Sequence, residues 1–316
     1  MLKDFISIHD LSPYEDEFYE ILKMTKEMKN HPHRFKNKLK KKTLAMIFQK
    51  PSLRTRITFE LGIEQLGGKA IYFAPADIQM GTRESVHDVG KNFELWFDGI
   101  MIRTFAHQEV IDLAKSVKIP VINGLTDLLH PCQAMADFFT LYEKRGHLVN
   151  LKLAYVGDGN NVCHSLLFAA AKAATKISVK MSVATPPGYE PKAEIVKLAK
   201  EDAQETNFSL ELTNDPRGAV EEADAVYTDV WASMGQEKER EMRAKIFAPF
   251  QVNQALMARA KPNAFFMHCL PAHRGEEVTD EVLESPNSIV YDQAQNRLHI
   301  QKVIMLLLMG KRQRNE

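Results

Sequence analysis

Short apolar segments rich in β-branched side chains alternate with longer amphipathic segments along most of the chain. The short segments have the length and composition of buried strands, as in "KTLAMIF" near the start and "LKLAYVGD" near the middle. They form two series, which are separated by one long helical segment. The predicted strands span residues 42–48, 69–74, 98–104, 119–124, 151–158, 176–185, 208–215, 223–230 and 263–270.

The segments between these strands have helical spacing of their apolar residues. Strands that alternate with helices predict parallel sheets covered on both faces. We therefore predict an α/β fold with two doubly wound parallel-sheet domains, a cleft between them, and a C-terminal helix that packs back on the first domain. The predicted helices span 56–66, 85–96, 108–117, 162–174, 191–203, 216–222 and 250–260, with two more beginning at "HPCQ" and at "NRLHIQ".

The domain boundary is expected near "KRGHLVN", just after the long helix that begins at "HPCQ". The first domain then covers residues 1–147, joined by the C-terminal helix 297–316, and the second covers 148–296. A chain of 316 residues is long enough for two domains with separate cores.

Composition excludes several classes of protein. Lys plus Arg and Asp plus Glu both number 41, which argues against a general nucleic-acid or anionic-membrane partner. The three cysteines and the absence of CxxC or HxxxH spacing argue against disulfides and a structural metal. Neither a signal peptide nor an apolar run long enough to span a bilayer is recognisable. We predict a soluble cytoplasmic protein.

Open α/β sheets bind ligands beyond the carboxyl ends of their strands, so the segments after each strand are the first place to look for chemistry. "KPSLRTR" follows the first predicted strand, and Ser52 is a predicted N-cap. Free N–H groups at a helix start favour an anion, and Arg54 and Arg56 can add charge-assisted hydrogen bonds to phosphate. The alternative is an ordinary capped helix with solvated arginines.

"HPCQ" opens another helix, in which His130 and Gln133 lie one turn apart. An imidazole and an amide suit a polar, uncharged group such as a carbamoyl or carboxamide. The alternative is that His130 lies at the start of the helix without binding a ligand.

"GDGNN" resembles a dinucleotide loop but lacks the GxGxxG spacing. Asn160 or Asn161 could instead bind a carboxylate or an α-amino group. The alternative is an asparagine that caps the helix in a tight turn.

Two further motifs follow strands in the second series. In "DVWASMGQ", Asp229 could hold an ammonium group or accept a proton, or it could cap a loop. In "HCLPAHRG", His268 and Cys269 are neighbours on a strand and point to opposite faces, which weakens a Cys–His thiolate mechanism. A lone cysteine is also often a small buried hydrophobe.

The motifs "SLRTR", "HPCQ", "DVWASMGQ" and "HCLP" occur in one order. Together they closely resemble the aspartate/ornithine carbamoyltransferase family, from about residue 4 to residue 312. "SMG" and "HCLP" narrow the resemblance to members that use ornithine as the acceptor. Leu53 departs from the commonest family pattern, in which threonine is frequent, but only the backbone N–H of that position is expected to contribute.

The resemblance implies that the first domain binds carbamoyl phosphate, that the second binds ornithine, and that no metal or organic cofactor is needed. It implies catalytic roles for Asp229, Cys269, Arg103 and His130. It implies ornithine binding by Asn161, Asp229, Ser233 and Met234. It implies carbamoyl phosphate binding by Ser52, Leu53, Arg54, Thr55, Gln79, Arg103, His130, Gln133, Cys269, Leu270 and Arg297, with Gln79 supplied by a neighbouring subunit of a homotrimer or an assembly of trimers.

The implied reaction is attack of the neutral δ-amine of ornithine on carbamoyl phosphate, which gives citrulline and phosphate. Either Asp229 or Cys269 could assist removal of the amine proton. "DGNN" and "TPPGYEP" favour the arginine-forming over the arginine-degrading type. Alternatives are a sister transferase that uses putrescine, N-acetylornithine or aspartate, a non-enzymatic binding protein of the same fold, and a nicotinamide-dependent dehydrogenase.

Overall fold

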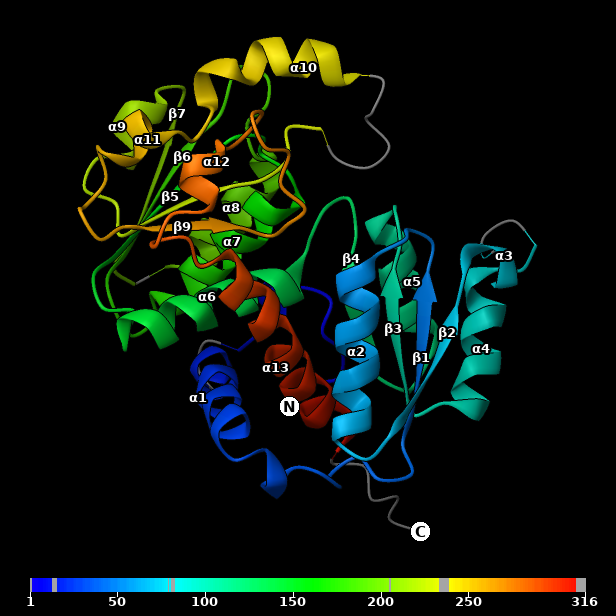
Figure 1. The fold of residues 1–316 in the computed structure, drawn as a ribbon. Helices are drawn as coiled ribbons and strands as arrows, with labels where there is room; N and C mark the ends of the chain where they lie inside the picture. The colour runs from blue at the N-terminus through cyan, green and yellow to red at the C-terminus, as the bar shows by residue number, and fades with distance from the viewer. Residues whose placement is uncertain are drawn as a thin grey trace. The chain divides into compact units, whose positions relative to one another are not determined.

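The computed structural model describes residues 2–12, 16–78, 80, 83–204, 206–232 and 239–310. The chain divides into two compact units. Unit 1 comprises Met1–Phe139 and Asn296–Glu316, and unit 2 comprises Thr140–Gln295. Each unit is built on a parallel sheet with helices around it (Figure 1), which confirms the predicted fold class.

The sheet of unit 1 has the strand order β2-β1-β3-β4, and all its pairs are parallel. The three strands other than β2 are almost entirely buried, whereas β2 lies at an edge and is half-exposed. Burial on both faces explains why these segments read as continuous apolar runs. The strands are β1 (Thr43–Phe48), β2 (Lys69–Phe73), β3 (Gly99–Arg103) and β4 (Val121–Leu125).

Helices cover both faces of this sheet. Apolar side chains of α4 and α5, such as Phe93 and Leu113, form one cluster with Ile47 and Ile102 of the sheet. On the other side α2 packs closely on α13, because a β-carbon at Gly62 would lie 2.9 Å from the Met305 side chain. The helices that begin in unit 1 are α1 (Glu17–Asn30), α2 (Leu53–Gln65), α3 (Pro75–Ile78), α4 (Val86–Trp96), α5 (His107–Ser116) and α6 (Pro131–Arg145).

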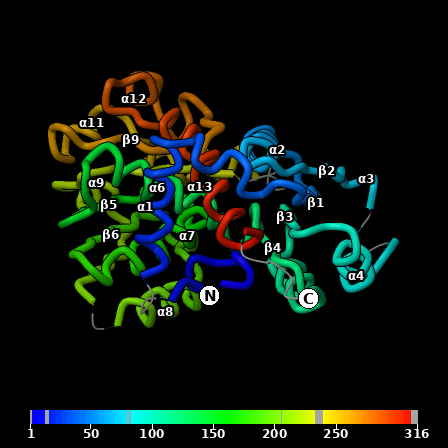
Figure 2. The backbone as a smooth tube through the Cα atoms, turned by 90° about the horizontal axis from the view of Figure 1, so that it is seen from below, coloured from blue at the N-terminus to red at the C-terminus, as the bar shows by residue number. Residues whose placement is uncertain are grey.

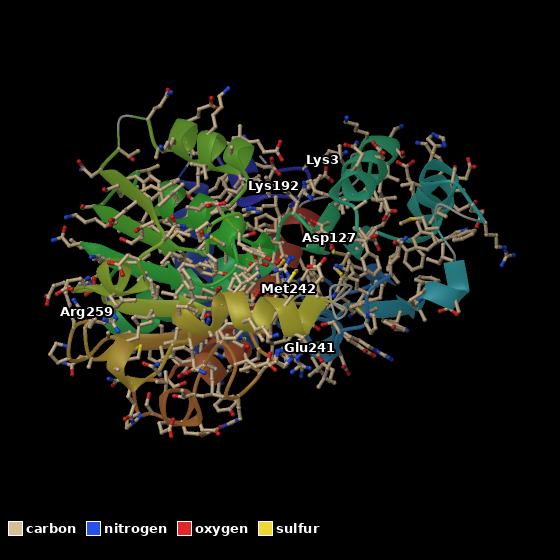
Figure 3. The ribbon with its side chains drawn as sticks, turned by 90° about the horizontal axis from the view of Figure 1, so that it is seen from above. Lys3, Asp127, Lys192, Glu241, Met242 and Arg259 are labelled. Carbon is tan, nitrogen blue, oxygen red and sulfur yellow. The ribbon has the colours of Figure 1, made fainter. Side chains whose placement is uncertain are left out.

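Both ends of the chain belong to unit 1. The N-terminal segment adds a bridge from Phe5 to Ile122, and Lys3 donates hydrogen bonds to carbonyl oxygens at the end of α5 (Figure 3). The C-terminal helix α13 (Val290–Met309) begins in unit 2 and enters unit 1 at Asn296. The predicted return of this helix to the first domain is thereby confirmed.

The sheet of unit 2 has the strand order β7-β6-β5-β8-β9, again with all pairs parallel. Its carboxyl ends carry the segments that the sequence marked for chemistry. Within the described residues, each of the nine predicted strands is present, with bounds that differ by a few residues. The strands of unit 2 are β5 (Leu151–Val156), β6 (Val179–Ala184), β7 (Phe208–Thr213), β8 (Ala225–Thr228) and β9 (Phe265–His268).

The helices of unit 2 alternate with its strands. Two of them, α9 and α11, are far apart in sequence but lie side by side at the outer edge of the unit (Figure 1, Figure 2). The side chains of Glu241 and Met242 project from α10, whereas Arg259 lies beyond α11 (Figure 3). The helices are α7 (Asn161–Ala173), α8 (Ala193–Asp202), α9 (Pro216–Val220), α10 (Arg240–Phe247), α11 (Gln254–Met257) and α12 (Asp280–Leu283), with 3₁₀ turns at Ile8–Asp10, Pro32–Arg34 and Ala248–Phe250.

The prediction of one helix over 250–260 is wrong. The chain forms a 3₁₀ turn ending at Phe250, and then Val252 pairs in extended conformation with Val278. Asn253 caps a new helix there by accepting a hydrogen bond from the backbone N–H of Leu256. Four further helices, α1, α3, α10 and α12, were not predicted from sequence. Among the described residues, no helix is both long enough and apolar enough to cross a bilayer.

Candidate functional site

The N-terminus of α2 follows directly from the end of β1. Ser52 has an extended backbone and caps the helix, since its Oγ accepts a hydrogen bond of 3.3 Å from the Thr55 N–H. The first-turn N–H groups and the helix dipole give this end partial positive charge. The Leu53 side chain is 72% exposed, so it adds nothing polar to this end. Arg54, in the same first turn, is half-buried.

Two buried arginines converge on the hydroxyl of Thr55. Arg103, at the end of β3, donates to Thr55 Oγ1 over 3.3 Å, and Arg297, in the middle of α13, donates over 3.2 Å. All three residues are at most 6% exposed. Two guanidinium groups in so little space make a strong site for an anion, because both can donate paired hydrogen bonds to oxygens.

His130 and Gln133 belong to the same cluster through Arg297. Nη1 of Arg297 lies 2.5 Å from Oε1 of Gln133 and 3.5 Å from Nε2 of His130. Burial lowers the pKa of His130 well below its usual value, and the positive charges of Arg297, Arg103 and Arg54 lower it further. The imidazole is therefore neutral near pH 7 and acts as a polar but uncharged group.

Lys50, two positions before Ser52, pairs with a neighbouring loop and was not identified from sequence. Its ammonium forms an ion pair with Asp127, in the segment between β4 and α6, and lies 4.3 Å from the ring centroid of Phe105. Lys50 is only 4% exposed. The sequence feature that could have identified Lys50 is its position directly before Pro51, in the segment "KPSLRTR" that follows the first predicted strand. We name Ser52, Arg54, Thr55, Arg103, His130, Gln133 and Arg297 the donor cluster.

Unit 2 has its own cluster, centred on the carboxylate of Asp229 after β8. The Cys269 thiol donates to Asp229 Oδ1 over 3.0 Å, and the Asn160 amide donates to Asp229 Oδ2 over 2.8 Å. Asp229 is 5% exposed, and a buried carboxylate needs such donors. Asn161, which the resemblance had favoured over Asn160, is the first residue of α7. We name Asn160, Asn161, Asp229 and Cys269 the acceptor cluster.

A buried ion pair lies beside the acceptor cluster. Arg243 of α10 donates to Asp158 Oδ2 over 3.1 Å and to the carbonyl oxygen of Trp231 over 2.9 Å. Burial raises the pKa of Asp158 to about 6, although the charge of Arg243 opposes this rise. Asp158 lies at the end of the predicted strand 151–158, and its partner Arg243 was not identified from sequence, because 85 positions separate the two residues.

His268 supports the strand end that carries Cys269 and is not positioned as a thiol partner. Its Nδ1 accepts the Leu270 N–H over 2.8 Å, which places the ring hydrogen on Nε2, 3.2 Å from Glu277 Oε1. Potential metal-ligand atoms of Asp229, His268 and Cys269 lie within 4.8 Å of one another. Nδ1 of His268 accepts the Leu270 N–H, so this nitrogen is not available as a metal ligand.

The structure thus brings the predicted residues together as two groups, one in each unit. Leu270 directly follows Cys269 and has a left-handed backbone with φ 58°. Three residues implied by the resemblance, Gln79, Ser233 and Met234, lie outside the described residues.

Comparisons with known proteins cover nearly the whole chain. Residues 3–143 match the family model described as "Aspartate/ornithine carbamoyltransferase, carbamoyl-P binding domain", and residues 149–308 match "Aspartate/ornithine carbamoyltransferase, Asp/Orn binding domain". A protein of Thermococcus kodakarensis named ornithine carbamoyltransferase is 53% identical, covering 98% of this chain and 96% of that protein. A Pyrococcus furiosus protein named "Ornithine carbamoyltransferase, anabolic" is 51% identical, with coverage of 98% and 96%.

The fold agrees with the same assignment. A solved structure of ornithine carbamoyltransferase from Pyrococcus furiosus superposes with a TM-score of 0.93 at 50% sequence identity, and 98% of each chain is covered. Similarity of this extent in both sequence and structure shows that the chain belongs to the aspartate/ornithine carbamoyltransferase family.

Proposed function

We propose that this protein is an ornithine carbamoyltransferase, which transfers the carbamoyl group of carbamoyl phosphate to the δ-amine of L-ornithine. The products are L-citrulline and phosphate. The observation that carries this proposal is the convergence of Arg103 and Arg297 on Thr55, at the N-terminus of α2, with the neutral imidazole of His130 beside them.

The donor cluster supplies the charges that carbamoyl phosphate requires. The phosphate takes the N–H groups of the first turn of α2, the Ser52 hydroxyl and the Arg54 guanidinium. The carbonyl oxygen gains negative charge during attack and is stabilised by Thr55, Arg103 and His130. The Gln133 side chain binds the carbamoyl amide. Arg297 orients the Gln133 side chain for this role by donating a hydrogen bond to its Oε1.

The acceptor cluster prepares the amine. Ornithine enters with its δ-amine protonated, and only the neutral amine attacks. The Asp229 carboxylate holds the ammonium and, with the Cys269 thiol that donates to it, assists departure of the proton. Asn161 binds the α-substituents of ornithine. Leu270 and Cys269 contact the carbamoyl end, and Ser233 and Met234 complete the ornithine pocket.

The proposal is tested by measuring citrulline formation from carbamoyl phosphate with ornithine, and product formation with putrescine, N-acetylornithine and aspartate in parallel. Ornithine is expected to give a kcat/KM higher than that of each other amine by at least ~100-fold, because the buried polar groups of the site are otherwise left unpaired. Equal or greater activity with another amine would change the assigned acceptor. No turnover with any amine would favour a binding protein that retains the fold.

We also propose that the reaction runs in the direction of arginine synthesis, as the name of the Pyrococcus furiosus relative supports. No metal or organic cofactor is required, because the arginines of the donor cluster carry the positive charge. Treatment with a chelator is therefore expected to leave the rate unchanged. A reducing, cytoplasmic location suits the mechanism, since the Cys269 thiol must stay reduced to donate to Asp229.

We propose that the protein assembles as a homotrimer, or as a set of trimers, through unit 1. Exposed apolar side chains at Leu53, Ile57 and Leu61 form a stripe along α2, and the edge strand β2 exposes Ile71 nearby in sequence. Ile57→Lys is expected to reduce the mass of the assembly measured by light scattering. Leu212→Lys is the matched control, because Leu212 is equally exposed at 43% on the edge strand β7 of unit 2.

A further inference from the structure

Asn160 has its side-chain amide fixed in one orientation. Its Oδ1 accepts hydrogen bonds from the backbone N–H groups of Val162 and Cys163, at 3.0 and 3.2 Å, and lies 3.3 Å from the Tyr155 hydroxyl. A reversed amide would point its NH₂ group at two backbone donors. The Nδ2 group must therefore face the other way, toward Asp229.

The two carboxylate oxygens of Asp229 receive donors from different strand ends. Nδ2 of Asn160, after β5, reaches Oδ2 at 2.8 Å, and the Cys269 thiol, after β9, reaches Oδ1 at 3.0 Å. Asn160 thus joins the start of α7 to the Asp229 carboxylate. Its hydrogen bond, together with that of the Cys269 thiol, fixes the plane of the Asp229 carboxylate.

We propose that Asn160 is a positioning residue, whose amide holds the Asp229 carboxylate in the orientation that receives the δ-ammonium group of ornithine. This inference rests on the proposed function. The same side chain is also the N-cap of α7, so Asn160 would have two roles, one in capping the helix and one in orienting Asp229. Neither role requires Asn160 to contact substrate.

Several other titratable or charged groups lie near Asp229. The Asp158 carboxylate interacts with it electrostatically and is paired with Arg243. His268 and Cys269 lie beside it on the β9 side. Burial raises the pKa of both Tyr155 and Cys163 well above their usual values, so these two remain neutral near pH 7. Any change in the pH dependence must be compared with the parent protein, in which these groups are the same.

Asn160→Asp separates the two roles. A carboxylate still caps α7 by accepting the same N–H groups, but it cannot donate to Asp229 and it places a second negative charge against it. Two facing carboxylates retain a shared proton to higher pH. The acidic limb of the pH profile of kcat/KM for ornithine should move up by about one pH unit, and kcat/KM at pH 7 should fall by ~10- to 100-fold.

The matched control is Asn253→Asp. Asn253 is also a half-buried N-cap in unit 2, and its side chain accepts the Leu256 N–H at 3.0 Å. It should retain the profile of the parent protein. Carbamoyl phosphate affinity and melting temperature are measured for every variant. A parent-like ornithine KM and pH profile for a folded Asn160→Asp variant would overturn the inference.

Asn160→Ser provides a second test if the Asp variant does not fold. Serine also caps helices, but its side chain is too short to reach Asp229. We expect a lower kcat/KM for ornithine without the upward displacement of the pH profile, because no new charge is added. Full activity of this variant would also contradict the inference. Lack of citrulline formation by the unmodified protein, in contrast, would remove the proposed function itself.

Discussion

Nη1 of Arg297 lies 2.5 Å from Oε1 of Gln133, although 164 positions separate the two residues. The other end of the same amide donates to Asp137 over 2.7 Å, so the Gln133 side chain is held from both sides. Arg297 also donates to Thr55. A single guanidinium in α13 therefore connects the start of α2 with the start of α6.

Replacement of Arg297 by lysine should lower kcat/KM for carbamoyl phosphate by ~100-fold, because an ammonium cannot serve Thr55 and Gln133 in the planar geometry of a guanidinium. Steady-state kinetics with carbamoyl phosphate as the varied substrate measure this. Arg259→Lys is the control, since Arg259 pairs with Glu221 at an exposed position in unit 2. Unchanged kinetics in the Arg297 variant would exclude it from the donor cluster.

Arg54→Ala should weaken carbamoyl phosphate binding by ~100-fold or more while the fold is retained, because a charge-assisted contact to phosphate is lost from a half-buried helix start. Calorimetric titration with carbamoyl phosphate and the melting temperature measure the two effects. Arg56→Ala should have the smaller effect on binding, since Arg56 lies over the Tyr72 ring and pairs with Glu60. An unchanged affinity for the Arg54 variant would remove the phosphate assignment of this helix.

Cys269→Ser should lower turnover and ornithine affinity by ~10-fold each, because a hydroxyl is smaller than a thiol and changes the donor that faces Asp229 Oδ1. Carbamoyl phosphate affinity and melting temperature serve as internal controls and should change little. If neither turnover nor ornithine affinity changed, Cys269 would be only a packed side chain at the end of β9.

Asp158 provides a prediction about the pH dependence of stability. Its folded-state pKa of about 6 lies above the reference value of 3.8, so protonation favours the folded state. This contribution is fully present below about pH 4 and is lost as the pH rises to about 6. Asp158→Asn cannot titrate, and its amide oxygen can still accept from Arg243.

The free energy of unfolding of Asp158→Asn should therefore rise relative to the parent protein by about 1 kcal/mol between pH 5 and pH 7.5. Urea unfolding of both proteins at the two pH values measures the difference. The difference in unfolding free energy between the two proteins could instead be the same at both pH values, or the parent could become relatively more stable at pH 7.5. Either result would contradict burial as the cause of the raised pKa of Asp158.

The strands could be predicted from sequence because most of them are buried on both faces. β3 is fully buried along its length, so its residues form an uninterrupted apolar run that ends at Arg103. Arg103 ends β3 and Asp229 directly follows β8, so both lie at strand ends, where the sequence analysis looked for chemistry. β2 was also found, although it is half-exposed, because β-branched and aromatic residues dominate it.

The helices that were missed carried weaker signals. In α10 the buried residues are Arg243 and Phe247, whereas Met242 and Ile246 are exposed, so the apolar pattern does not mark the buried face. The pattern in α1 was present, since Phe18 and Leu22 are buried one turn apart.

The candidate site was predictable as a set of local motifs but not as a set of contacts. "HPCQ" indicated that His130 and Gln133 act together, and both indeed contact Arg297. The choice between Asn160 and Asn161 could not be made from sequence, because it depends on which residue after β5 reaches Asp229 after β8. Contacts of this kind depend on the strand order, which the sequence pattern does not determine.

The return of α13 to unit 1 has a consequence for synthesis of the chain. Ser52, Arg103 and Gln133 all leave the ribosome long before Arg297 does. A nascent chain, or a fragment that ends at Phe139, has no Arg297 to join Thr55 with Gln133. Capture of the carbamoyl donor is thereby postponed until α13 has been synthesised, and an N-terminal half expressed alone is expected to need this helix supplied as a separate peptide.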